Sequence, residues 1–222
     1  MNALVPDTSF HMYNHANGFE NIFKEAENYR FFLEKYKLHI SPIAETYAYC
    51  LMPNHFHLVV RIRKREVIES LIRNKNISLE ENTSKVLSFG CVSDNEIEKF
   101  LSKQLANLFS SYTQSFNKVY HRMGSLFIKN FKREPITDKS HFLNAIMYTH
   151  RNPIHHGFCK SFDEWPHSSY SGIIYGAESL VETDMMLKMA GGIDNFIEMH
   201  KINLIRFESK TNLEIPDHHF KI

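Results

Sequence analysis

The stretch that decides the fold reads Leu51-Met52-Pro53-Asn54-His55-Phe56-His57-Leu58-Val59-Val60. Its second half is rich in β-branched and aromatic residues and follows a proline, which predicts a strand that starts near His55. Residues two apart on a strand point to the same face, so His55 and His57 project together while Phe56 enters the core. Two imidazoles on one face can share a divalent ion with a third ligand, and the alternative is a pair of surface histidines.

The segments around this stretch show helical or strand periodicity in turn. A first strand is expected near 11–14, and 43–62 is expected to form two strands interrupted by Met52-Pro53-Asn54, with Asn54 as a turn residue that aims His55. Residues 63–94 are polar and weakly periodic, which predicts a long loop with a helix only near 64–72. Beyond them we expect a strand over 125–136 and helices over 95–120, 138–151, 169–175 and 194–203, in addition to an early helix over 24–36.

Length and composition are those of an ordinary globular chain. The 222 residues are 43% hydrophobic and 23% charged, which fits one domain with or without appendages and excludes disordered, collagenous and coiled-coil proteins. No apolar run approaches the roughly 18 residues of a membrane span, and the first ten residues lack the features of a signal peptide. Three widely spaced cysteines are expected to be reduced thiols in a cytosolic protein: Cys50, Cys91 and Cys159.

Charge is informative through its distribution. The formal net charge of +1 does not mark a nucleic-acid binder, but residues 118–133 carry five cationic side chains, interleaved aromatics and no acid. Single-stranded nucleic acids are commonly held by such a combination, whereas the plainer interpretation is a solvated helix end followed by an amphipathic strand. The candidate DNA-phosphate contacts are Arg122, Lys129, Lys132 and Arg133.

Tyr148 and Asn152 lie four residues apart near the end of a predicted helix, so their side chains share one face. Tyr148 offers a phenol, and Asn152 offers an amide oxygen that is able to complete a metal site. A metal ion beside a tyrosine suits phosphoryl transfer, because the ion stabilises charge at phosphorus while a phenolate acts as the covalent nucleophile. The alternative for Tyr148 is a tyrosine that packs on the sheet.

Four segments, in order, resemble the single-tyrosine HUH transposases, which include small insertion-sequence transposases and REP-associated tyrosine transposases. The stretch Leu51 to Val60 is similar to their His-hydrophobe-His strand. The other three segments are Asn117 to Arg133 with its Gly124-Ser125-Leu126-Phe127, then Tyr148-Thr149-His150-Arg151-Asn152-Pro153-Ile154-His155-His156-Gly157, and Trp165-Pro166-His167-Ser168-Ser169-Tyr170. Together the matches cover about residues 10–175.

The resemblance implies a chemistry. It makes His55 and His57 metal-binding histidines, Asn152 a further metal ligand and Tyr148 the nucleophile. The family cleaves single-stranded DNA beside imperfect hairpins, forms a 5′-phosphotyrosine link with a free 3′-OH, and rejoins strands. The cofactor is Mg²⁺ or Mn²⁺. Because two imidazoles suit softer ions, we expect Mn²⁺ to serve at least as well as Mg²⁺, and Zn²⁺ to bind without supporting the reaction.

The resemblance also implies an α+β fold, with an antiparallel sheet and helices packed on one face, in a ferredoxin-like variant. Residues 1–175 would form the catalytic domain and 176–222 a helical tail. The partner would be single-stranded DNA with hairpins, not a membrane; relatives include both homodimers and proteins that act alone, and a homodimer is left open. The expected location is the cytoplasm, in association with the nucleoid of a prokaryotic cell.

Two other functions stay open at this point. One is a catalytically silent hairpin-binding protein of the same fold, which would have no need for the complete set of His55, His57, Tyr148 and Asn152. The other is a metal-dependent phosphoesterase that uses water as nucleophile. Structural roles are expected for His11 and His15. His150, His155 and His156 lie near the proposed site, and surface loop positions are expected for them; the alternative is a contact with the scissile phosphate or with Tyr148.

Overall fold

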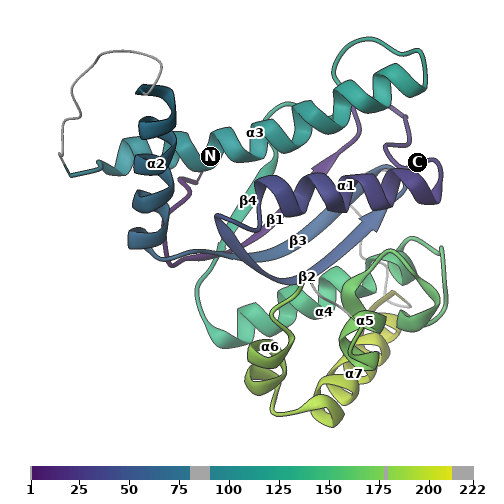
Figure 1. Cartoon of the computed structure of the whole chain (residues 1–222). Helices are drawn as coiled ribbons and strands as arrows, with labels where there is room; N and C mark the ends of the chain where they lie inside the picture. The colour runs from purple at the N-terminus through teal and green to yellow at the C-terminus, as the bar shows by residue number, and fades with distance from the viewer. Residues whose placement is uncertain (1, 81–90, 178–179, 212–222) are drawn as a thin grey trace.

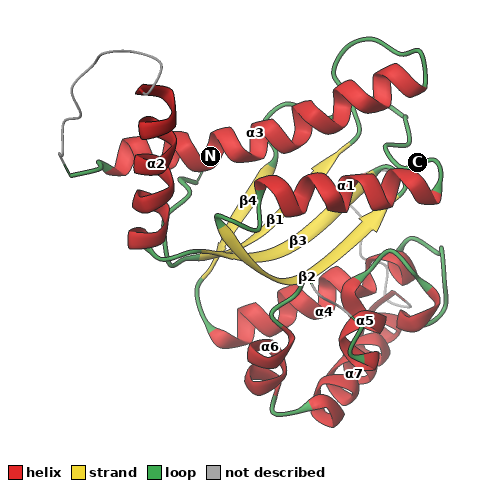
Figure 2. Ribbon diagram, in the orientation of Figure 1, coloured by secondary structure: helices red, strands yellow, loops and turns green. Residues whose placement is uncertain are grey.

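The computed structural model describes residues 2–80, 91–177 and 180–211. At its centre lies a four-stranded antiparallel sheet in the order β2-β3-β1-β4 (Figures 1 and 2). The chain runs β1, α1, β2, β3, α3, β4, which is a ferredoxin-like arrangement and confirms the predicted α+β class. These elements are β1 (Ser9–His15), α1 (Ala26–His39), β2 (Ala44–Met52), β3 (His55–Ile62), α3 (Asp94–Val119) and β4 (Lys132–Ile136).

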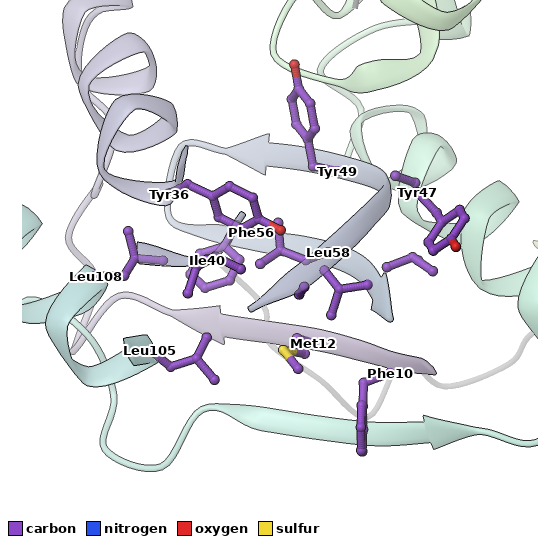
Figure 3. Close-up of a cluster of buried hydrophobic side chains, with 14 of the residues drawn as sticks. Phe10, Met12, Tyr36, Ile40, Tyr47, Tyr49, Phe56, Leu58, Leu105 and Leu108 are labelled. Atoms are coloured by element: carbon purple, nitrogen blue, oxygen red, sulfur yellow. The ribbon is translucent and has the colours of Figure 1, made fainter. Parts of the chain in front are cut away.

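One face of the sheet carries the main hydrophobic core. Cross-strand pairs Phe10–Val60 and Met12–Leu58 place apolar side chains of β1 and β3 on the same face. Helices α1 and α3 cover this face, and Figure 3 shows Leu105 and Leu108 of α3 beside the strand residues. Each helix buries one apolar stripe at helical spacing; in α3 it comprises Ile97, Leu101, Leu105, Leu108, Tyr112 and Phe116.

The opposite face is covered by α4 (Lys139–His155), so helices lie on both sides of the sheet and not on one alone (Figure 1). The Asp138 carboxylate caps the helix by accepting from the His141 N–H at 2.8 Å. The sequence predicted that this helix stops before Pro153, but it continues to His155, and the His156 N–H donates to the Asn152 carbonyl at 3.0 Å. Burial of its inner residues against β2 outweighs the one bond that proline removes.

Two further sequence predictions are corrected. The excursion over 63–94 is not mainly a loop, since α2 (Arg65–Glu80) is a 16-residue helix; residues 81–90 lie outside the described part of the chain. The strand expected over 125–136 is shorter, because β4 begins only at Lys132. Before it the chain makes an isolated bridge between Phe127 and Ala16, and Asn130 adopts a positive φ of 64° that ends regular pairing.

The C-terminal third packs on α4 and β2. It contains a 3₁₀ turn (Phe162–Glu164), α5 (Ser169–Tyr175), α6 (Thr183–Ala190) and α7 (Ile193–Thr211). Trp165 donates its indole N–H to the Leu51 carbonyl at 3.1 Å, and α7 contacts α4 (Figure 1). The described part of the expected tail is therefore joined to the central fold. No helix in the described ranges has the length and apolar character needed to cross a membrane.

A buried hydrogen-bond chain links four elements of this region. The Tyr49 N–H of β2 meets the Ser169 hydroxyl at 2.9 Å, and that hydroxyl meets His150 Nε2 at 2.8 Å. His150 Nδ1 lies 2.9 Å from His200 Nε2, and His200 Nδ1 donates to the Phe196 carbonyl at 2.8 Å. Every hydrogen bond in this chain has a donor when both imidazoles are neutral: His200 and His150 each donate from Nδ1, and Ser169 donates to His150 Nε2. His150 is thus a core residue and not the surface residue that the sequence suggested.

This chain makes stability depend on pH. Burial lowers the pKa of His200 from 6.5 to about 4. Burial, and after it the charge of the nearby His200, lowers the pKa of His150 well below its usual value. The unfolded chain therefore binds more protons below pH 6.5, and the free energy of unfolding falls as the pH drops from 6.5 towards 4. We expect His200 alone to account for about 2–3 kcal/mol of this loss by pH 4.5.

Replacing His200 with leucine removes the acceptor of the His150 N–H. We expect His200→Leu to lower the free energy of unfolding at pH 7 by roughly 1–3 kcal/mol, and to flatten its slope between pH 6.5 and 4.5. Urea denaturation at several pH values measures both effects, and the exposed His121→Asn is the matched control. A His200→Leu slope equal to that of the wild type would contradict this account.

Candidate active site

The face of the sheet opposite the main core carries a cluster of imidazoles. The register pairs His15 with His55 and Tyr13 with His57, so the alternation of β1 and β3 gathers these rings on one surface. The His15 and His55 rings stack at 4.7 Å between centroids, and the His11 and His57 rings stack at 5.1 Å. His55 and His57 are perpendicular at 5.2 Å, which confirms that both project from the same face.

Helix α4 places Tyr148 and Asn152 over this cluster, as their spacing predicts. The Tyr148 ring meets the His57 ring edge-on at 5.4 Å, and Asn152 Oδ1 lies 2.9 Å from His55 Nε2. His55, His57 and Asn152 are buried and His11 and His15 are half-buried, whereas Tyr148 is 40% exposed. The site therefore has a buried polar floor and a phenol that solvent can reach.

His55 is held between two amide oxygens. Its Nδ1 lies 2.7 Å from Asn54 Oδ1, in the turn between β2 and β3, and its Nε2 faces Asn152 Oδ1. A neutral imidazole has one N–H, so when Asn54 accepts it, the Nε2 lone pair and the Asn152 oxygen face one another. A cation between them satisfies both. Without a cation, a half-turn of the Asn152 amide lets its Nδ2, a buried atom with no partner here, donate to Nε2.

His57 is held in a similar way by His11. Its Nδ1 lies 3.0 Å from His11 Nε2, so the pair shares one hydrogen bond. In the tautomer with the proton on His57 Nδ1, the Nε2 lone pair of His57 remains available to a ligand. Partners at the second nitrogen of a metal-binding histidine commonly fix its tautomer and orientation. His11 and Asn54 occupy this position for His57 and His55.

Burial keeps His11, His55 and His57 neutral near pH 7. It lowers the pKa of His55 to about 3 and that of His11 to about 4. Burial, with His11 and His55 as neighbours, also lowers the pKa of His57 well below its usual value. Neutral imidazoles are the form that binds metal ions.

The donor set fits a divalent ion only in part. Within residues 2–80, 91–177 and 180–211, no three His, Cys, Asp or Glu side chains converge to hold a metal ion. The candidate ligands are two neutral imidazoles and one amide oxygen, His55, His57 and Asn152, which leaves further coordination positions for water or substrate oxygens. This open set matches a catalytic site better than a closed structural one.

The chain is similar to known proteins in sequence and in fold. No protein-family model matches it. A Haemophilus influenzae protein with the provisional name REP-associated tyrosine transposase is 21% identical over 171 residues, which are 76% of either chain. The solved structure of a REP-associated tyrosine transposase bound to a REP hairpin shares the fold, with a TM-score of 0.54 over 81% of this chain and 87% of that one, at 11% identity. The chain is thus similar in sequence to a REP-associated tyrosine transposase, and it shares the fold of one whose structure is solved.

Sequence reasoning missed parts of this candidate site. His11 was assigned a structural role, although it contacts His57 and lies edge-on to Tyr148 at 5.7 Å. Asn54, by contrast, was expected to aim His55 from the turn, and it does so through its contact with His55 Nδ1. Arg151 was passed over, and its guanidinium carbon lies 5.9 Å from the centre of the Tyr148 ring. The HUH motif gives no signal for His11, because its partner is 46 residues away.

The four predicted DNA contacts divide into two pairs. Arg122 is bonded to Glu20, Asn117 and the Ser125 carbonyl, and Arg133 is buried on the α3 side, where it meets Glu98, Ser102 and the Asn2 carbonyl. Both therefore hold the fold together. Lys129 and Lys132 are exposed, and the pairing of Lys132 with Tyr13 puts Lys132 on the histidine face.

This division predicts that substitution of Arg133 lowers stability and substitution of Lys132 does not. Arg133→Ala leaves Glu98 and the Asn2 carbonyl without their partner, so we expect the free energy of unfolding to fall by roughly 1–3 kcal/mol. Lys132→Ala removes an exposed side chain, and we expect a change within about 0.5 kcal/mol. Urea denaturation of the two variants, which differ at adjacent positions of β4, measures the difference. Equal stabilities would show that Arg133 has no structural role.

Proposed function

We propose that this protein is a metal-dependent transposase or endonuclease that acts on single-stranded DNA beside hairpins, with Tyr148 as the nucleophile. The observation that carries the proposal is the position of α4. One face of this helix puts the Tyr148 phenol edge-on to His57 and the Asn152 oxygen 2.9 Å from His55 Nε2. A DNA-binding module needs neither a partly exposed phenol nor an open donor set beside it.

The proposed reaction is a transfer of phosphorus between oxygens. Tyr148 Oη forms a bond to phosphorus as the P–O3′ bond of the DNA breaks, and the 3′ oxygen gains a proton for the one that the phenol loses. Attack by another 3′-OH on the phosphotyrosine reverses these roles and rejoins strands. The Arg151 guanidinium near the Tyr148 ring favours the anionic phenolate by charge, and Lys132 lies on the same face to contact the DNA backbone.

His55, His57 and Asn152 would hold the divalent ion, which when bound withdraws charge from a phosphate oxygen. Mg²⁺ and Mn²⁺ are the proposed ions. The Asn54 and His11 contacts orient the two imidazoles whether or not the ion is present. A hairpin as substrate is supported by the related solved structure, whose protein is bound to a REP hairpin. A role in the cytoplasm at the nucleoid would follow from such a substrate.

Covalent trapping tests the nucleophile. We expect wild-type protein, incubated with end-labelled hairpin DNA and Mn²⁺ and then denatured, to give a labelled band of protein mass. Tyr148→Phe removes only the hydroxyl, so we expect it to lose the band and to keep DNA affinity within a few-fold. Gel analysis of both proteins, with an EDTA arm, measures the adduct.

Tyr13→Phe is the matched control, since Tyr13 faces the same cluster and its ring stacks on His57 at 5.4 Å. It should retain the band. A band that survives Tyr148→Phe would move the nucleophile to another residue. Tight binding without any band, across DNA from the gene's own flanks, would favour the catalytically silent hairpin binder.

Metal binding is tested without turnover. We expect Mn²⁺ to raise the melting temperature of the wild-type protein by mass action, and His57→Ala to abolish this rise. Asn54→Ala removes only the partner of His55 Nδ1, so we expect a roughly 10- to 100-fold weaker Mn²⁺ affinity. Calorimetric titration measures affinity, with the exposed His121→Asn as control. An affinity for Mg²⁺ far above that for Mn²⁺ would contradict the donor assignment.

A further inference from the structure

The two most exposed large apolar side chains in the described ranges lie on neighbouring loops. Phe19 is 97% exposed in the loop after β1, and Met123 is 91% exposed in the loop after α3. A single exposed apolar side chain on a protein surface is ordinary. Two nearly complete exposures on adjoining loops, one of them anchored on the turn that carries Asn54, form a candidate contact surface.

The Phe19 loop is anchored on the turn that positions His55. At its start the Ala16 N–H donates to the Asn54 carbonyl at 2.7 Å, and at its end the N–H groups of Ile22 and Phe23 donate to the Pro53 carbonyl at 2.8 and 2.9 Å. Phe19 stands three residues from Ala16, so its Cα lies within roughly 11 Å of that anchor. The same turn supplies the Asn54 oxygen to His55.

The two loops are also tied to each other. The Asn17 N–H donates to the Leu126 carbonyl at 2.8 Å, and Arg122 forms an ion pair with Glu20. In Figure 1 the purple segment after β1 runs beside the end of α3. The tie to Glu20 explains why Arg122 is not a free DNA contact. Both loops are thereby held in place, and Phe19 is displayed by a fixed backbone.

The charge around Phe19 and Met123 indicates which class of ligand they would contact. Of the five cationic residues between 118 and 133, Arg122 and Arg133 pair with Glu20 and Glu98, which leaves Lys118, Lys129 and Lys132, and the segment itself has no acidic residue. The Ile128 N–H donates to the His15 carbonyl, so exposed Lys129 follows directly on the edge of the histidine cluster. Exposed aromatic side chains among cations are the combination that holds single-stranded nucleic acid. An apolar protein partner would not call for these cations.

We propose that Phe19, with Met123 on the adjoining loop, is a stacking platform for unpaired bases in the DNA that flanks the hairpin. This inference rests on the proposed function, since it names the part of the substrate that lies beside the reacting phosphate. Arg122 acts as a positioning residue that holds the two loops together through Glu20. Lys129 neutralises the backbone of the stacked nucleotides.

The test compares DNA with and without unpaired flanks, in EDTA so that no cleavage intervenes. We expect Phe19→Ala to weaken binding of a hairpin with ten-nucleotide single-stranded flanks roughly tenfold, and to leave binding of the blunt hairpin unchanged. Phe19→Trp should restore the affinity. A scan of 2-aminopurine along the flanks should find a position whose fluorescence changes with wild-type and Phe19→Trp protein but not with Phe19→Ala.

Tyr175→Ala is the matched control, because Tyr175 is an aromatic on α5 with 73% exposure. It should bind both DNAs as the wild type does. Unchanged affinity of Phe19→Ala for flanked DNA, or an equal loss with the blunt hairpin, would overturn the proposal. If Phe19→Ala forms the Tyr148 adduct normally and binds DNA with unchanged affinity, the stacking proposal fails and the proposed cleavage stands. If the fluorescence change needs Phe19 but the wild-type protein never forms the adduct, the proposed cleavage fails and base stacking on Phe19 stands.

Discussion

Strand β3 is buried on both faces, and the rest of the molecule is arranged around this constraint. Its odd residues His55 and His57 lie on one face, and Phe56 and Leu58 lie on the other. A slip of one residue would exchange imidazoles for core side chains, so the register is fixed by the core as well as by the site. The main core under α1 and α3 therefore decides where the histidines point, although none of its residues takes part in the chemistry.

The orientation of helix α4, which covers the histidine face of the sheet, is fixed as well. Tyr148 and Asn152 lie on one side of this helix, and His150, two residues from each, points away from them into the chain that joins Ser169 and His200. That chain fixes the rotation of α4 about its own axis. The C-terminal segment, which shares no chemistry with the site, thus orients the phenol over the imidazoles. A helix held only by apolar contacts could settle in neighbouring rotations at small cost.

The sequence predicted the parts of the site that depend on local periodicity. The two-residue spacing of His55 and His57 and the four-residue spacing of Tyr148 and Asn152 were enough to place each pair on one face. The contact of His11 with His57 was not predictable, because the sequence of neither strand alone determines the register between β1 and β3. Arg122 and Arg133 were misjudged for a related reason. The sequence does not distinguish an arginine that bonds a distant carbonyl of the same chain from an arginine that contacts a DNA phosphate.

Burial gives the site its chemical character before any ion arrives. Asn54 contacts Nδ1 of His55, and His11 contacts Nδ1 of His57. Lowered pKa values keep both rings neutral near pH 7. The folding of the sheet has therefore already removed water from the donors and set their orientation. An incoming cation meets an arranged surface and loses little further freedom in binding. If these residues hold an ion as proposed, its identity would depend on donor softness, and two imidazoles with one amide oxygen would favour Mn²⁺ over the harder Mg²⁺.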